Sequence, residues 1–111
     1  MAYESVPKAK RARLHAAFAE WIEGRIGDRD EMASLLAHHY AAAVSPDVAD
    51  LAWGTDTERL DALPRRAIRW LRRAGDLAMS RYELDDAIVL FEQAHPLRGS
   101  LPAQHLLQLA R

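Results

Sequence analysis

The sequence has no cysteine, and it has few glycines and prolines, five of each in 111 residues. Without cysteine, the chain cannot be a disulfide-stabilised secreted domain, and it cannot hold a thiolate zinc or iron–sulfur site. No apolar run approaches the ~20 residues that a membrane-spanning helix needs, and the polar segment 1–13 has no signal-peptide core. We therefore expect a soluble, cytoplasmic protein that does not bind a membrane.

A strong charge of either sign is also missing. The 15 basic and 16 acidic residues leave a net charge of −1, which disfavours a polyanion as the partner of the whole chain. Half of the residues are apolar, which is too many for a disordered chain, and the length suits a single domain over 1–111. Because alanine and leucine dominate, we predict an all-α fold of about five helices.

Residues 7–44 predict an irregular pair of antiparallel helices. The first is expected over about Pro7–Glu23. Its large apolar residues recur at helical spacing and are expected to face the core: Leu14, Phe18, Trp21 and Ile22. The second is expected to begin at a cap on Asp28 or Asp30 and to stop before Pro46. Its predicted buried stripe consists of Met32, Leu35, Leu36, His39, Tyr40 and Ala43.

Residues 45–62 predict a linker, with a short helical turn in the sequence VADLAW. A connection of this length is unusual, so it is a candidate for mobility or for an interface. Two starts are open for the next helix. It could begin at Thr55, which has capping-box spacing to Glu58, and kink at Pro64. Alternatively, it begins at Pro64 with Asp61 as its cap.

The three tryptophans are expected to lie in different environments. Trp21 is on the apolar stripe of the first helix and is predicted to be buried in the core. Trp70 is off the main stripe of its helix, and we expect it to pack with Leu77 on the preceding helices. Trp53 is in the predicted linker, so we expect it to be exposed or to fill an interface.

Residues 63–95 predict a second helix pair with a tight turn at Tyr82. The apolar positions of its first helix are Ala67, Ile68, Leu71, Ala74 and Ala78; those of its second are Leu84, Ala87, Ile88, Phe91 and Ala94. Gly75 lies inside the first pattern at a cost of ~1 kcal/mol relative to alanine, which indicates that another helix approaches closely there. Residues 101–111 predict a partial capping helix with an unpaired apolar face, so we expect self-association through that face.

The stretch Ile68–Leu101 resembles a tetratricopeptide (TPR) repeat, a pair of antiparallel helices in 34 residues with small residues at set places. The positions that match the family's packing residues are Leu71, Gly75, Ala78, Ala87, Phe91 and Ala94. Tyr82 replaces the usual turn glycine, and Pro96 stops the second helix early. The resemblance implies helix pairs stacked as a short α-solenoid that binds proteins or peptides.

The whole chain is also similar to the helical region that follows the ATPase module in large bacterial signalling proteins, including nucleotide cyclases and ATPase-containing transcriptional regulators. The segments that carry this likeness are YESVPKAKRARLHAAFAEWIE, LLAHHYAAA and RWLRRAGDLAMSRYELDDAIVLFEQA. It implies that the chain is a fragment of a longer protein. No phosphate-binding loop is present in the sequence.

Residues that could carry chemistry are few. The side chains of His38 and His39 are adjacent on a helix and point about 100° apart, so by themselves they do not chelate one ion; His15 could join them only through the tertiary fold. No serine or threonine has an evident base partner, and the acidic pairs resemble solvated helix faces or caps: Asp85-Asp86 and Glu20/Glu23. We therefore predict no metal site, no cofactor and no enzymatic activity.

Five arginines crowd the first helix of the second pair: Arg65, Arg66, Arg69, Arg72 and Arg73. The TPR resemblance implies that the exposed side of this helix lines a concave peptide groove; the matching positions are Arg69, Arg72, Asp76 and Met79, with Arg73 beside them. An acidic peptide, or an acidic segment of the parent protein, would suit such a groove. The alternative is a solvated face with local pairs such as Arg72–Asp76.

The sequence thus predicts a non-catalytic module for protein–protein interaction or intramolecular scaffolding. Two alternatives from other classes stay open. The first is binding of nucleic acid or an acidic ligand through the same arginines, which lack the interleaved aromatic residues of a stacking platform. The second is a small metal-dependent helical enzyme.

Overall fold

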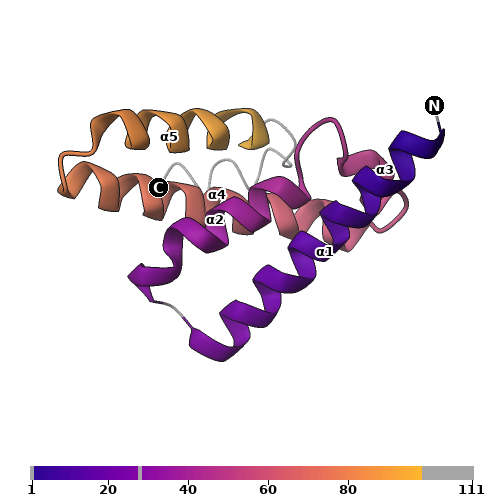
Figure 1. The fold of residues 1–111 in the computed structure, drawn as a ribbon, viewed down its shortest axis with the longest axis horizontal. Helices are drawn as coiled ribbons and strands as arrows, with labels where there is room; N and C mark the ends of the chain where they lie inside the picture. Colours follow the sequence, from indigo (N-terminus) through magenta and orange to yellow (C-terminus); the bar gives the residue numbers. More distant parts are fainter. Residues whose placement is uncertain (1, 28, 99–111) are drawn as a thin grey trace.

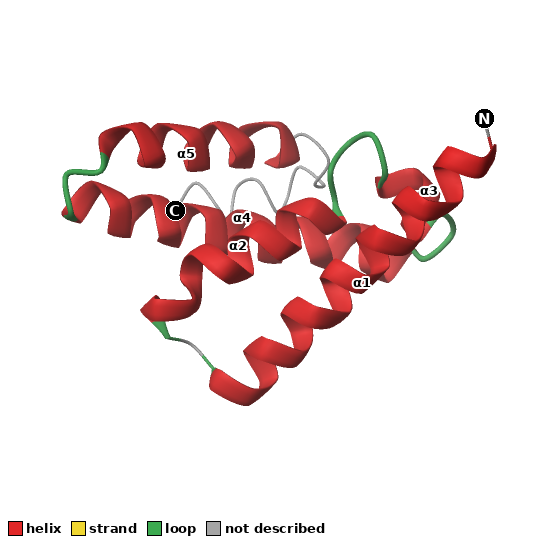
Figure 2. Cartoon of the chain, viewed as in Figure 1, coloured by secondary structure: helices red, strands yellow, loops and turns green. Residues whose placement is uncertain are grey.

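The computed structural model describes residues 2–27 and 29–98, and the side chains of 7–27 and 29–97. Every regular element in these residues is helical (Figures 1 and 2), as the composition predicts. The elements are α1 (Ala2–Ile26), the 3-10 turn η1 (Asp30–Met32), α2 (Ala33–Ala43), α3 (Ala49–Trp53), α4 (Thr57–Ser80) and α5 (Leu84–Arg98). The capping segment expected at 101–111 lies outside the described residues.

The long helices pack in the order α1, α2, α4, α5, each against the next. Figure 1 shows α4 and α5 side by side and antiparallel, with α1 and α2 meeting at an angle below them. The two central helices supply the largest fully buried side chains: Leu36, Tyr40, Leu63, Ile68, Trp70 and Leu71. The core therefore sits along the α2–α4 contact.

Helix α1 buries a different stripe from the expected one. Its alanines at 9, 12, 16 and 19 are buried together with Ile22, whereas Leu14, Phe18 and Trp21 are exposed. Both sets recur at helical spacing, but small side chains let two helix axes approach closely, and α2 lies against the alanines. The prediction that Trp21 is a core residue is wrong: 60% of its surface is exposed.

The region 45–62 is more ordered than the predicted linker. The VADLAW sequence forms α3, as expected, and α4 already begins at Thr57 with Asp56 as its N-cap; the Asp56 side chain accepts a hydrogen bond from the Arg59 amide. Helix α4 then continues through Pro64. Trp53 is 8% exposed and donates to the Ala43 carbonyl at 2.8 Å, so the expectation of an exposed Trp53 is wrong.

Helix α2 follows the predicted stripe more closely. Leu36, Tyr40 and Ala43 are buried, but Leu35 is exposed, contrary to expectation. Of the two expected caps, Asp28 lies outside the described residues, and Asp30 lies inside η1, whose N-cap position is Arg29. Trp70 is buried in α4, as predicted, with only 1% of its surface exposed.

The α4–α5 contact confirms the close approach expected at Gly75. A Cβ atom there would lie 2.7 Å from the Phe91 ring, so only glycine leaves room for that ring. Ala78, Ala87 and Ala94 are also buried in this part of the fold, whereas the predicted core residues Leu84 and Ile88 are exposed. The helices are joined at Tyr82, which has a φ of 61°.

Helix α5 continues to Arg98, past Pro96, where the sequence predicted a stop. A proline at this position removes the helical hydrogen bond that its backbone nitrogen would donate to the Glu92 carbonyl. No described helix is long enough and apolar enough to span a bilayer.

Candidate functional site

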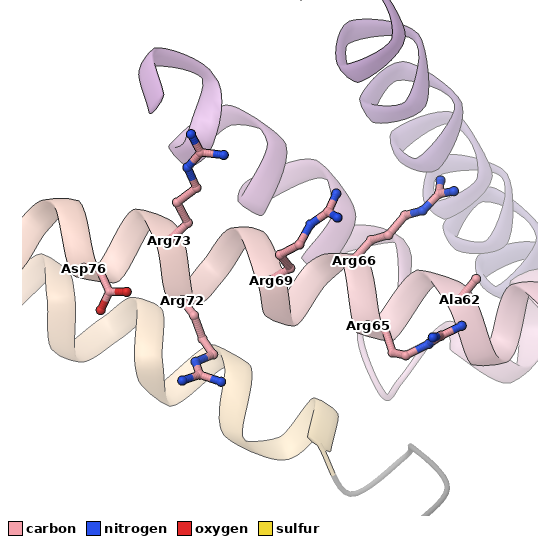
Figure 3. Close-up of a pocket in the computed structure, with 7 residues that line it drawn as sticks. All are labelled: Ala62, Arg65, Arg66, Arg69, Arg72, Arg73 and Asp76. Carbon is pink, nitrogen blue, oxygen red and sulfur yellow. The ribbon is translucent and has the colours of Figure 1, made fainter. Parts of the chain in front are cut away.

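A hollow with a volume of about 620 Å³ lies on α4. It is lined by Ala62, Arg65, Arg66, Arg69, Arg72, Arg73 and Asp76 (Figure 3). Successive residues of a helix are ~100° apart, so these arginines span roughly 120° of the helix surface. Figure 3 shows Arg66 and Arg73 pointing to one edge of this face and Arg65 and Arg72 to the other.

The structure thus places four of the five predicted partner-binding residues in one hollow: Arg69, Arg72, Arg73 and Asp76. Met79, the fifth, is exposed one turn further along α4 and is not among the lining residues. We call the lining set the arginine hollow.

The arginines of the hollow make tertiary ion pairs that sequence spacing did not predict. Glu20 of α1 accepts from Arg59 at 2.8 Å and from Arg66 at 3.3 Å. Arg73 donates through Nε to Asp30 of η1 at 2.8 Å. Arg65 makes a local pair within α4, with Asp61 at 3.1 Å. Because α1 contacts α4 mainly through such long side chains, the pairs tie α1 to the centre of the fold.

Glu23 is a second anchor between α1 and α4. Its Oε1 accepts from the Tyr40 hydroxyl at 2.8 Å and from Trp70 Nε1 at 3.2 Å, while its Oε2 accepts from Arg69 at 3.0 Å. Burial of Tyr40, reinforced by its hydrogen bond to Glu23, raises the pKa of the phenol to about 12. The sequence suggested a solvated Glu23, since nothing in the spacing brings residues 23, 40 and 70 together.

The hollow keeps donors available beyond these pairs. A guanidinium carries five N–H groups, and Arg66 and Arg69 each bond to an acid through one nitrogen. Their side chains remain 42% and 60% exposed. Arg69 and Arg73 also lie over the Trp70 ring, at 5.5 Å and 5.0 Å from its centroid. The Trp70 ring covers one face of each guanidinium and leaves the opposite side of the group open to solvent.

A second cluster brings together His15 of α1 and His38 and His39 of α2. One ring nitrogen from each lies within 4.8 Å of the others, and the two Nδ1 atoms of His15 and His39 are 2.8 Å apart. Burial, the largest cause, lowers the pKa of both these rings, and the neighbouring His38 lowers it further. The sequence contains no pattern that predicts His15 beside His38 and His39. The packing of α1 against α2 brings the three rings together.

Comparison with known proteins supplies no independent assignment for either site. No protein-family model, no curated protein and no solved structure matches the chain. The TPR resemblance therefore stays a prediction, and the function is argued from the geometry of the arginine hollow alone.

Proposed function

We propose that the chain is a non-catalytic, TPR-like interaction module that binds an acidic peptide or an acidic protein segment in the arginine hollow of α4. The observation that carries the proposal is the concentration of five arginines around one hollow of about 620 Å³. Arginine is the side chain best suited to carboxylates, because its planar fork donates two parallel hydrogen bonds.

The ion pairs within the fold favour this function as well as stability. They hold Arg66 and Arg69 in fixed orientations, so less side-chain entropy is lost when a ligand binds. From Arg65 to Arg73 the helix rises ~12 Å, a distance that about four residues of an extended peptide cover. A short run of glutamates is therefore the matching ligand. As part of a longer bacterial signalling or regulatory protein, the module would recognise such a run in another protein or elsewhere in its own chain.

The proposal is tested by fluorescence anisotropy with a labelled peptide of consecutive glutamates, using the equivalent glutamine peptide as the ligand control. We expect the glutamate peptide to bind and the glutamine peptide not to bind. The double variant Arg66→Gln/Arg69→Gln should weaken binding by at least ~10-fold, because each charged hydrogen bond contributes ~1.5–3 kcal/mol. Arg81→Gln removes one arginine charge outside the hollow and should leave the affinity unchanged.

Glu20→Gln separates a ligand-binding role from a purely structural one. This variant keeps every arginine but removes the acid that engages Arg59 and Arg66. If the hollow binds carboxylates, the glutamate peptide should bind more tightly to Glu20→Gln than to the wild type. Failure of the wild type and of this variant to bind the peptide would overturn the proposal.

A single-stranded oligonucleotide serves as the rival ligand in the same assay. Added salt should weaken the binding of both ligands. The affinity of the oligonucleotide should fall more steeply with salt concentration if several of its phosphates contact arginines. Tighter binding of the oligonucleotide than of the peptide, abolished by Arg66→Gln/Arg69→Gln, would replace the peptide proposal with nucleic-acid binding.

A further inference from the structure

The three clustered histidines lie at the rim of the α1–α2 contact. Ala12 and Ala16, on either side of His15, are buried, as is Ala37 next to His38. Because these side chains are small, the two helix backbones approach closely, and the His15 ring comes to lie 5.0 Å from the His39 ring and 5.9 Å from the His38 ring. The cluster therefore follows from the packing of the fold.

The distance between the His15 and His39 ring nitrogens is close to the distance between two nitrogens that bind the same metal ion. Two nitrogens bonded tetrahedrally to one zinc ion at ~2.0–2.1 Å lie about 3.3 Å apart. The His15 and His39 Nδ1 atoms are 2.8 Å apart, so a separation of about half an ångström would admit the ion between them. Without a metal this contact requires one ring to donate and the other to accept, and a divalent ion can replace the shared proton.

The protonation state also suits coordination. A metal binds neutral imidazole, and burial, which lowers the pKa of His15 and of His39, favours the neutral form of both rings. The Phe18 ring packs edge-on against His39 at 4.7 Å and restricts its orientation, as an apolar outer shell does around metal ligands. Arg11 also lowers the pKa of His15, which favours the neutral ring, but its positive charge repels a metal cation as well.

We propose that His15, His38 and His39 form a binding site for a divalent transition-metal ion of the zinc class, with a fourth coordination position open to solvent. Three imidazoles without thiolate or carboxylate ligands suit zinc, copper and nickel rather than magnesium or calcium. The ion would crosslink α1 to α2. This site is independent of the arginine hollow.

The test uses the purified full chain, stripped of metal by a chelator, and zinc ions alone as the ligand. We expect isothermal titration calorimetry at pH 7.5 to give one zinc ion per chain. Cobalt substituted for zinc should give the intense visible absorption of a tetrahedral or five-coordinate site. His15→Gln and His39→Gln should each reduce the zinc affinity by more than the ~10–100-fold expected for loss of an outer-shell partner. His95 is an exposed histidine of α5, and His95→Gln is the matched control that should have no effect.

A readout on the wild type keeps the test independent of whether the variants fold. On addition of zinc, the ring NMR signals of His15, His38 and His39 should shift together, and that of His95 should stay in place. Absence of zinc binding by the wild type at millimolar zinc would overturn the proposal. Unchanged affinity in the folded double variant His15→Gln/His39→Gln would also overturn it, as would zinc-dependent shifts at His95 alone.

Discussion

The central helices differ from the outer ones in the size of the side chains that they bury. The central helices are α2 and α4, and the outer helices are α1 and α5. The central pair buries the large residues, including Leu36, Tyr40 and Trp70. The outer helices bury mainly alanine and expose most of their large apolar residues, among them Trp21 and Ile88. A helix packed between two other long helices must fill the volume between them, whereas an outer helix can pack through small side chains that let its backbone approach the core closely.

The largest test of this comparison uses two tryptophans. Trp70→Ala removes a fully buried side chain of a central helix and a hydrogen-bond donor to Glu23. We therefore expect the free energy of unfolding to fall by ~3–5 kcal/mol. Trp21→Ala, on an outer helix, should change the free energy of unfolding by less than ~1 kcal/mol. Urea denaturation followed by circular dichroism measures both. Equal losses would show that the exposed face of α1 is part of the core.

Tyr40 gives a pH-dependent test of the central helices. Its pKa is raised in the folded chain to about 12 from an ordinary value of 10.0. The folded state keeps the proton longer than the unfolded state, so this stabilisation is complete below pH 10 and is lost as the pH rises to 12. A shift of two units corresponds to roughly 2–3 kcal/mol.

The measurement is urea unfolding at pH 9.5 and at pH 12. Tyr40→Phe cannot ionise and should lose roughly 2–3 kcal/mol less than the wild type over this interval. Tyr82→Phe removes an exposed phenol and should behave as the wild type does. The same alkaline loss in Tyr40→Phe and in the wild type would contradict the assignment.

The close approach of α1 to α2 is tested by enlarging one alanine. Ala16 is completely buried, and Ala17 beside it is exposed. Ala16→Leu should destabilise the fold by ~1–3 kcal/mol because the helices must separate to admit the side chain. Ala17→Leu is the matched control and should be nearly neutral. Thermal unfolding would contradict the packing of α1 if the two variants had the same midpoint.

The smallest expected effect is at the turn between a central and an outer helix. Tyr82 is exposed and has a φ of 61°, a left-handed conformation that costs a non-glycine residue ~1–2 kcal/mol. Tyr82→Gly removes that cost but adds ~0.4–1 kcal/mol of unfolded-chain entropy. We expect a net stabilisation of about 0.5–1 kcal/mol, and Tyr82→Ala should give none.

Local patterns predicted much of the helical content. The α4 stripe that includes Ala67, Leu71 and Ala74 is buried as predicted, and Gly75 has the close contact that its position in mid-helix indicated. The prediction failed on α1, where two stripes compete. Large residues suggested the core face, but the choice between the stripes depends on which one a neighbouring helix can approach.

The arginine hollow was predicted in part. Helical spacing alone brings Arg69, Arg72 and Arg73 to one face of α4. Glu20 and Glu23, which hold Arg66 and Arg69, come from a helix more than 35 residues away in the sequence. No local rule pairs Glu20 or Glu23 with these arginines, because such pairing depends on how α1 crosses the core.

The sequence by itself determined the helical class, the order of the helices, the small residues at the α4–α5 contact and the arginine-rich face, since all of these depend on neighbours within a few turns of one helix. Only the tertiary structure decided which face of α1 is buried, which acids bind the arginines, and that His15 meets His38 and His39. Those outcomes depend on contacts between helices distant in the chain. They are selected by the total packing of the fold, which no single segment encodes.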